Sequence, residues 1–223
     1  MLQILYRYYS DLNHIIYHIT LLIGILTGLL RFKKIIRSSR IFLLLLVLTL
    51  FVELTAYYCA ITYHDNRFIY NPFNLFQFTL IWASFYLEMR LKPVLVVFII
   101  FMLFTGINMI FYQPLLSSSN SNTFLVEHLL IIILYFMYLV AYYKNADQGS
   151  LRTHPLYWIG LGWLLFSITS VVAFGFGYII STGSEWDNFS VWVKKISNYL
   201  LYLSIVIAFL SPQKNLRDVT TGK

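Results

Sequence analysis

Long apolar runs separated by short polar stretches form the dominant pattern of the chain. A helix that crosses a bilayer needs ~20 mostly apolar residues at a rise of 1.5 Å each. Seven stretches meet this requirement: 13–31, 41–63, 72–89, 93–112, 123–143, 155–180 and 189–211. Pro93 and Pro155 open two of them, and the first turn of a helix tolerates proline without losing a hydrogen bond. Because the runs show no two-residue alternation, they favour helices over the strands of a membrane barrel.

The composition supports a membrane protein and excludes an ordinary soluble domain. The chain has 223 residues, of which 59% are hydrophobic and 11% are charged, whereas a soluble domain is ~25% charged. The single cysteine, Cys59, allows no disulfide within the chain and no cysteine-based metal finger. The sequence therefore predicts an all-α membrane protein, a single seven-transmembrane-helix bundle over residues 1–223, with the lipid bilayer as a partner.

Basic residues are concentrated in alternate connections, which predicts the orientation. Twelve of the 16 Lys and Arg residues follow the first, third, fifth and seventh predicted helices: Arg31, Lys33, Lys34, Arg37, Arg40, Arg90, Lys92, Lys144, Arg152, Lys214, Arg217 and Lys223. The positive-inside rule then places the N-terminus outside and the C-terminus in the cytoplasm. The membrane that we expect to contain the protein is the inner membrane of the cell. Topology and anionic lipid account for the net charge of +7, so we predict no nucleic-acid partner.

Polar side chains cluster at one predicted depth, in the outer half of the helices. Polar groups are costly inside a membrane and tend to mark functional sites. The candidate ligand-binding residues at this depth are Glu53, Gln77, Asn108, Glu127, His128, Lys194 and Asn198. The inner half carries no predicted buried charge, because Glu88 is expected at the lipid–water interface. The pattern predicts a polar cup that opens to the outside above an apolar floor.

The carboxylates in this set allow a second interpretation. Glu53 and Glu127 could instead lock helices together, either protonated or paired with Lys194 or Lys195. His14 and His18 lie one helical turn apart and could bind a metal together with a carboxylate. Since the chain has no HExxH motif, however, we assign no metal and no other cofactor.

A resemblance to a known group of proteins accompanies these patterns. It is carried by HPLYWIGLGWLLFS (154–167), Glu53, NPFNLFQF (71–78), Asn108 and EHLLIIILYF (127–136). This combination resembles a family of uncharacterised bacterial seven-helix membrane proteins of similar length, to which no activity is assigned. More distantly, the architecture is similar to the seven-helix sensory modules of some bacterial histidine kinases. That likeness implies a sensory role.

We therefore expect a receptor-like or accessory sensor that binds a small solute or a lipid headgroup in the polar cup. Signalling would pass through a membrane or signalling protein partner, because the sequence carries no effector domain. A small-solute transporter, an intramembrane lipid-modifying enzyme and a structural membrane subunit remain alternatives. The apolar inner half argues against transport. The lack of a nucleophile or paired-acid motif argues against an enzyme, and we assign no catalytic residue.

Overall fold

The computed structural model describes residues 2–114, 120–144, 150–179 and 184–213, without the side chains of residues 2–14, 174–179 and 184–191. This part of the chain is all-helical and contains no β-strand. Its elements are α1 (Leu2–Leu30), α2 (Arg37–Tyr63), α3 (Arg67–Met89), α4 (Lys92–Phe111), α5 (Ser121–Lys144), the short 3-10 helix η1 (Leu151–Thr153), α6 (Pro155–Ile179) and α7 (Ser184–Leu210).

Each predicted apolar run forms one helix, which confirms the all-helical bundle. The largest differences are at the starts of α1, α3 and α7, which begin at Leu2, Arg67 and Ser184 rather than at 13, 72 and 189. These differences arise because the prediction followed apolar composition, whereas a helix can extend through polar residues beyond the bilayer core. Within the described residues, α2, α4, α5, α6 and α7 are long and apolar enough to cross a membrane. The structure is thus that of a multi-pass membrane protein.

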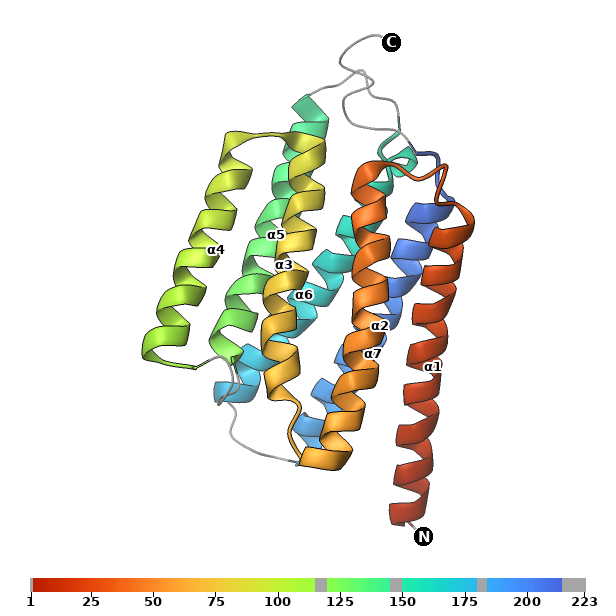
Figure 1. The fold of residues 1–223 in the computed structure, drawn as a ribbon, viewed down its shortest axis with the longest axis vertical. Helices are drawn as coiled ribbons and strands as arrows, with labels where there is room; N and C mark the ends of the chain where they lie inside the picture. The colour runs from red at the N-terminus through yellow and green to blue at the C-terminus, as the bar shows by residue number, and fades with distance from the viewer. Residues whose placement is uncertain (1, 115–119, 145–149, 180–183, 214–223) are drawn as a thin grey trace.

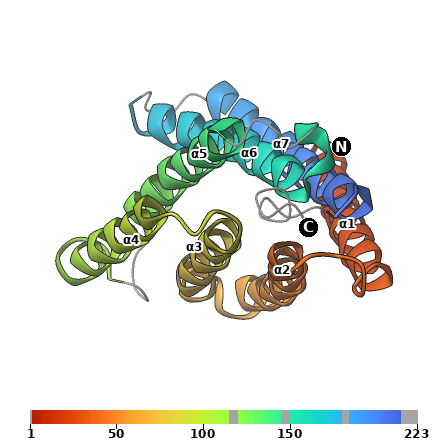
Figure 2. The ribbon, with the colours of Figure 1, turned by 90° about the horizontal axis from the view of Figure 1, so that it is seen from above.

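The helices alternate in direction (Figure 1), and the view from above shows that they form a ring (Figure 2). Around this ring α1 packs against α2, α2 against α3, α3 against α5, α5 against α6, α6 against α7, and α7 against α1. Helix α4 lies outside the ring, where it packs against α3 and α5 (Figure 2). Large apolar side chains on its outer surface, such as Leu103, Ile107 and Ile110, are exposed, as expected for a face that contacts lipid.

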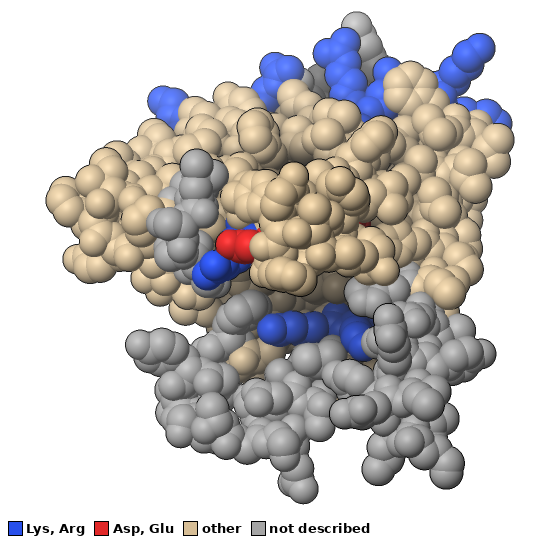
Figure 3. Space-filling view, turned by 60° about the horizontal axis from the view of Figure 1, so that its bottom comes forward, with Lys and Arg blue, Asp and Glu red and all other residues tan. Residues whose placement is uncertain are grey.

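The two ends of the bundle differ in charge. Described basic residues from the connections after α1, α3 and α5 lie at one end: Arg31, Lys33, Lys34, Arg37, Arg40, Arg90, Lys92, Lys144 and Arg152. Figure 3 brings the opposite end forward and shows Lys and Arg gathered along the far edge, together with other Lys and Arg side chains at the near end. The near end contains the α2–α3 turn.

An ion pair marks the α2–α3 turn. The guanidinium of Arg67 donates two hydrogen bonds to the carboxylate of Asp65, at 3.0 and 2.9 Å. These bonds, with one from the Arg67 backbone N–H, lower the pKa of Asp65 to about 2. Both groups are therefore charged at any pH well above 2. Because charges are costly in lipid, the turn belongs in water or in the headgroup region.

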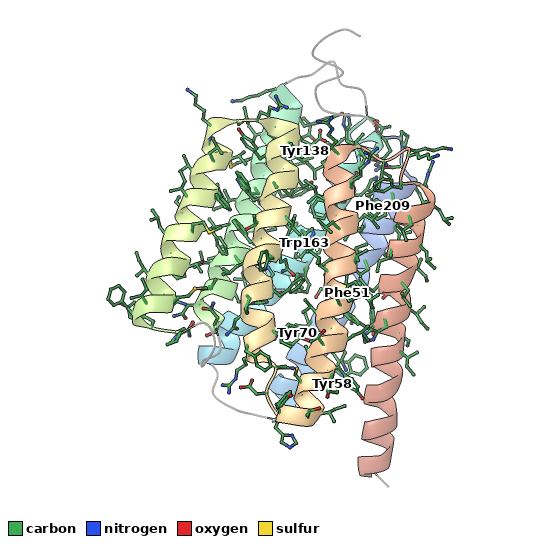
Figure 4. All side chains as sticks on the ribbon, viewed as in Figure 1. Phe51, Tyr58, Tyr70, Tyr138, Trp163 and Phe209 are labelled. Atoms are coloured by element: carbon green, nitrogen blue, oxygen red, sulfur yellow. The ribbon has the colours of Figure 1, made fainter. Side chains whose placement is uncertain are left out.

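The other half of the bundle is filled by aromatic side chains. Phe42, Phe85, Tyr138 and Phe209 are fully buried there, and Figure 4 shows Tyr138 and Phe209 near that end. Large aromatic side chains therefore pack the interior of this half. Close packing of this kind leaves little room for a polar path along the ring axis.

Glu88 corrects one expectation for this half. It lies at the end of α3, as expected for an interfacial position, but it is buried within the protein, with only 7% exposed. Its Oε1 accepts a hydrogen bond of 2.5 Å from the hydroxyl of Ser38 on α2. The reason is the rotation of α3, because position 88 faces α2 and not the lipid. A buried carboxyl is therefore present in the half that was expected to contain none.

Candidate functional site

A cavity of about 160 Å³ lies inside the ring, and its lining runs from the side of the α2–α3 turn across the middle of the bundle. Its described lining residues come from α1, α2, α3, α5, α6 and α7, which are the six helices of the ring. Figure 4 shows two of these residues, Tyr70 close to the α2–α3 turn and Trp163 near the middle of the bundle. A molecule in this cavity would contact every helix of the ring.

Glu53 on α2 is the centre of a hydrogen-bond network in the cavity wall. Its Oε1 accepts a bond of 3.1 Å from the hydroxyl of Tyr17 on α1, and its Oε2 accepts one of 2.9 Å from Tyr70 on α3. The Tyr17 hydroxyl is also 2.8 Å from that of Tyr202 on α7. The network thus connects four helices. A carboxylate has about four acceptor positions, so Glu53 retains capacity for a ligand.

Aromatic side chains form much of the remaining wall. Besides the three tyrosines, the described lining includes Phe73, Phe124, Trp163 and Phe166. Trp163 is 4% exposed, and its indole N–H has no hydrogen-bond partner among the described residues. An unpaired buried donor is costly, which indicates a site where a ligand or a water molecule supplies the acceptor.

Amide side chains supply the other polar groups of the wall. Asn74 and Gln77 on α3 and Asn198 on α7 line the cavity. The Gln77 amide donates a bond of 3.1 Å to Oε1 of Glu127, a fully buried residue on α5. Glu127 is not among the described lining residues, and its Oε2 has no hydrogen-bond partner among the described residues. It therefore positions an amide of the wall from behind.

His128 lies next to Glu127 in sequence and is also fully buried. Its Nδ1 is 3.1 Å from the hydroxyl of Ser167 on α6. The ring meets Phe124 and Phe166 edge-on, with centroids 4.2 and 5.3 Å apart. Since both phenylalanines line the cavity, His128 supports the aromatic wall and joins α5 to α6.

The structure brings together only part of the predicted site. Glu53, Gln77 and Asn198 line the cavity, and Glu127 and His128 lie behind its wall. Lys194 is half-buried on α7 but is not among the described lining residues. Glu53 hydrogen-bonds to tyrosines and forms no ion pair with a lysine in the described part of the chain.

Asn108 belongs to a different cluster. Its amide nitrogen shares its two hydrogens among three acceptors: Asn120 Oδ1 at 2.8 Å, Thr123 Oγ1 at 3.1 Å and Gln113 Oε1 at 3.2 Å. These contacts hold the end of α4 against the start of α5. Because α4 is not part of the ring, Asn108 shares the depth of the cavity without lining it.

The histidine pair receives no support as a metal site. The side chain of His14 lies outside the described residues, and His18 packs edge-on against Tyr17 with centroids 5.3 Å apart. Among the described side chains, no three His, Cys, Asp or Glu residues lie close enough together to hold a metal ion.

None of the aromatic lining residues was predicted from the sequence, because tyrosine and tryptophan in membrane helices are equally typical of the membrane interface and of the core. A helical stripe could have revealed them. On α3 the lining residues Tyr70, Asn74 and Gln77 follow the spacing i, i+4 and i+7, and Thr49 and Glu53 on α2 are four residues apart. Polar or hydroxyl-bearing residues at such spacing share one face of a helix.

Comparison with protein-family models, curated proteins and solved structures found no match to the chain. The fold and the cavity alone therefore define the class: a multi-pass helical membrane protein with a polar, aromatic-lined cavity inside a six-helix ring.

Proposed function

We propose that the protein is a receptor-like or accessory sensor of the cell's inner membrane, which binds a small solute or a lipid headgroup in the ring cavity. The observation that carries this proposal is the cavity wall, to which six helices contribute. A ligand shifts a conformational equilibrium only by its differential affinity for the two states. A ligand in contact with all six helices is well placed to favour one arrangement of the ring.

The Glu53 network suggests how binding would alter the ring. Tyr17 and Tyr70 donate to Glu53, and Tyr17 also bonds Tyr202. A ligand that attracts Glu53 would compete with these bonds and change the contacts of α2 with α1, α3 and α7. A partner protein against the outer surface of the ring would then sense the altered helix positions.

Filling the cavity should abolish ligand binding. Thr49 lines the cavity, and its hydroxyl bonds only to the carbonyl of Leu45 in its own helix, so Thr49→Phe would add a ring to the cavity at little polar cost. The melting midpoint of the purified protein would be measured with panels of organic cations, amino acids, organic anions and neutral polyols. We expect at least one panel to raise the midpoint of the wild type by several degrees and to leave Thr49→Phe unchanged.

Thr55 on the same helix provides a matched control. It is exposed and makes the same type of bond, to Phe51, so Thr55→Phe should respond to ligand like the wild type. If Thr49→Phe melts far below the wild type without ligand, Asn198→Phe fills the cavity from α7 instead. No shift with any panel, or equal shifts in cavity-filled variants, would contradict the proposal and favour a structural subunit.

The proposal includes seven membrane crossings with the N-terminus outside, which rests on the basic residues at one end of the bundle. Cysteine labelling in a Cys59→Ser background tests it. Tyr112 and Ser150 are exposed near opposite ends. We expect a membrane-impermeant maleimide to label Tyr112→Cys in intact cells and Ser150→Cys only after lysis. The reverse pattern would invert the proposed topology.

Transport is a second candidate, favoured by the buried Glu88 on the far side of the apolar floor. Transporters commonly place polar groups on both sides of a closed barrier. Counterflow in proteoliposomes distinguishes the two functions, with the solute that raises the melting midpoint as the labelled substrate. Accumulation by the wild type and none by Thr49→Phe would establish transport, whereas binding without counterflow would support the sensor.

A further inference from the structure

The cavity combines one acidic side chain with many aromatic side chains. Glu53 is the single charged residue among its described lining residues. Seven of the 16 described lining residues are aromatic. A carboxylate attracts a cation directly, and the negative face of an aromatic ring does so through its quadrupole. Both kinds of group repel an anion, so the electrostatics of the wall favour a positively charged ligand.

The wall suits an organic cation better than a metal ion. A hard metal ion such as Ca²⁺ takes about six to eight oxygen ligands, and no cluster of three metal-binding side chains occurs among the described residues. The carbon atoms of the aromatic rings can contact methyl or methylene groups while their faces stabilise the charge. Aromatic cages of this kind recognise substituted ammonium groups.

The volume of the cavity limits the size of its ligand. The cavity of about 160 Å³ is close to an engineered apolar cavity of roughly 150 Å³ that holds one benzene molecule. A tetramethylammonium or choline-sized group fits this volume, whereas a nucleoside or a disaccharide does not. The ligand is therefore a single small headgroup.

Trp163 supplies a second attachment point. Its indole N–H lacks a hydrogen-bond partner among the described residues although the side chain is buried. Trp163 lies near the middle of the bundle, and Tyr70, beside Glu53, lies nearer the α2–α3 turn (Figure 4). A ligand that spans the cavity could place its cation against Glu53 and an acceptor oxygen against Trp163.

We infer that the cavity binds a small organic cation of the ammonium type, whose positive group contacts Glu53 and the aromatic rings and whose oxygen accepts a hydrogen bond from Trp163. This inference rests on the proposed function, since it names the ligand class of the same cavity. The ammonium group could belong to a free solute or to the headgroup of a lipid.

The experiment compares choline with dimethylbutanol, its uncharged carbon isostere, by titration calorimetry on the full chain in nanodiscs of phosphatidylglycerol, which lack ammonium headgroups. We expect choline to bind and the isostere to bind at least about tenfold more weakly. Glu53→Gln should weaken choline on the order of 10- to 100-fold. Trp163→Phe should weaken choline more than tetramethylammonium, which has no oxygen.

Asp65→Asn is the matched control. It removes one negative charge at the same end of the bundle, but Asp65 pairs with Arg67 outside the cavity, so choline affinity should change less than about twofold. A melting curve without ligand verifies that Glu53→Gln is folded. Short-chain phosphatidylcholine added to the same discs distinguishes the sources: Glu53-dependent binding of that lipid, with none of free choline, would assign the site to a headgroup.

Other outcomes overturn the inference without overturning the proposed function. Equal affinity for choline and its isostere, or an undiminished affinity in Glu53→Gln, would show that charge is not recognised. If a neutral or anionic solute raises the melting midpoint and Thr49→Phe abolishes the effect, the cavity is a binding site of different chemistry. If neither a solute nor the short-chain phosphatidylcholine binds, both the inference and the proposed function fail.

Discussion

Replacing Phe101 by alanine is expected to lower the free energy of unfolding by about 3–5 kcal/mol. Phe101 on α4 is fully buried, and its ring centroid lies 3.9 Å from that of Phe78 on α3, which is also fully buried. Helix α4 lies outside the ring, so this pair is a main attachment of α4 to the rest of the bundle. Truncation would remove the contact and leave a void that the rigid ring cannot close.

Leu103→Ala on the same helix is the control for Phe101→Ala. Leu103 is 62% exposed on the outer face of α4, where lipid chains would occupy the space of the lost atoms, so we expect a change below about 1 kcal/mol. Reversible unfolding in mixed micelles would measure both variants. Since α4 contributes no described residue to the cavity, the folded Phe101→Ala protein should bind ligand like the wild type. Equal destabilisation by the two substitutions would contradict this view of α4.

The helices were predictable because the bilayer imposes their length and hydrophobicity. The position of each helix relative to its neighbours in the membrane plane was not predictable, and α4 shows why. Its apolar residues surround the helix almost completely: Val94, Val97 and Phe101 are buried, and Val96, Ile99, Ile100 and Leu103 are exposed. Lipid and protein interior are equally apolar. Sequence therefore marks such a segment as a membrane helix without indicating which neighbours it packs against.

The same limit applied to the candidate site. The position of a residue along a helix does not specify the direction in which its side chain points. Gln77 faces the cavity and Asn108 faces the α4–α5 connection. The burial of Glu88 was missed for the same reason, because its place at a helix end does not show that the rotation of α3 turns its side chain toward Ser38.

The two carboxylates for which alternatives remained open occupy different environments. Glu53 lines the cavity and accepts two tyrosine hydroxyls, so its place fits the binding interpretation. Glu127 is sealed behind the wall and bonds Gln77, which fits the interpretation of helix locking. The tyrosines around Glu53 could not be assigned in advance, because a tyrosine near the end of a membrane helix serves equally well as an interface anchor.

Gly160→Ala should destabilise the protein by about 1–3 kcal/mol, although it adds only one methyl group. A Cβ at Gly160 on α6 would overlap the ring of Tyr135 on α5, lying 2.5 Å from its Cε2, and would reach 3.4 Å from Cζ of Phe85. Both rings are buried, so neither can move aside without disturbing the packing of α5 against α6. The expected result is a lower melting midpoint, measured on the purified protein without ligand.

Gly106→Ala, in contrast, should not lower the stability of the protein. Gly106 lies inside α4, and nothing is within 4 Å of a Cβ built there. Alanine favours a helix over glycine by up to about 1 kcal/mol, so the melting midpoint should stay constant or rise. The two variants make the same chemical change, and the opposite signs would arise from packing alone. If Gly160→Ala were neutral as well, α5 and α6 would be less closely packed than the structure shows, and the aromatic wall that they share would be adaptable rather than preformed.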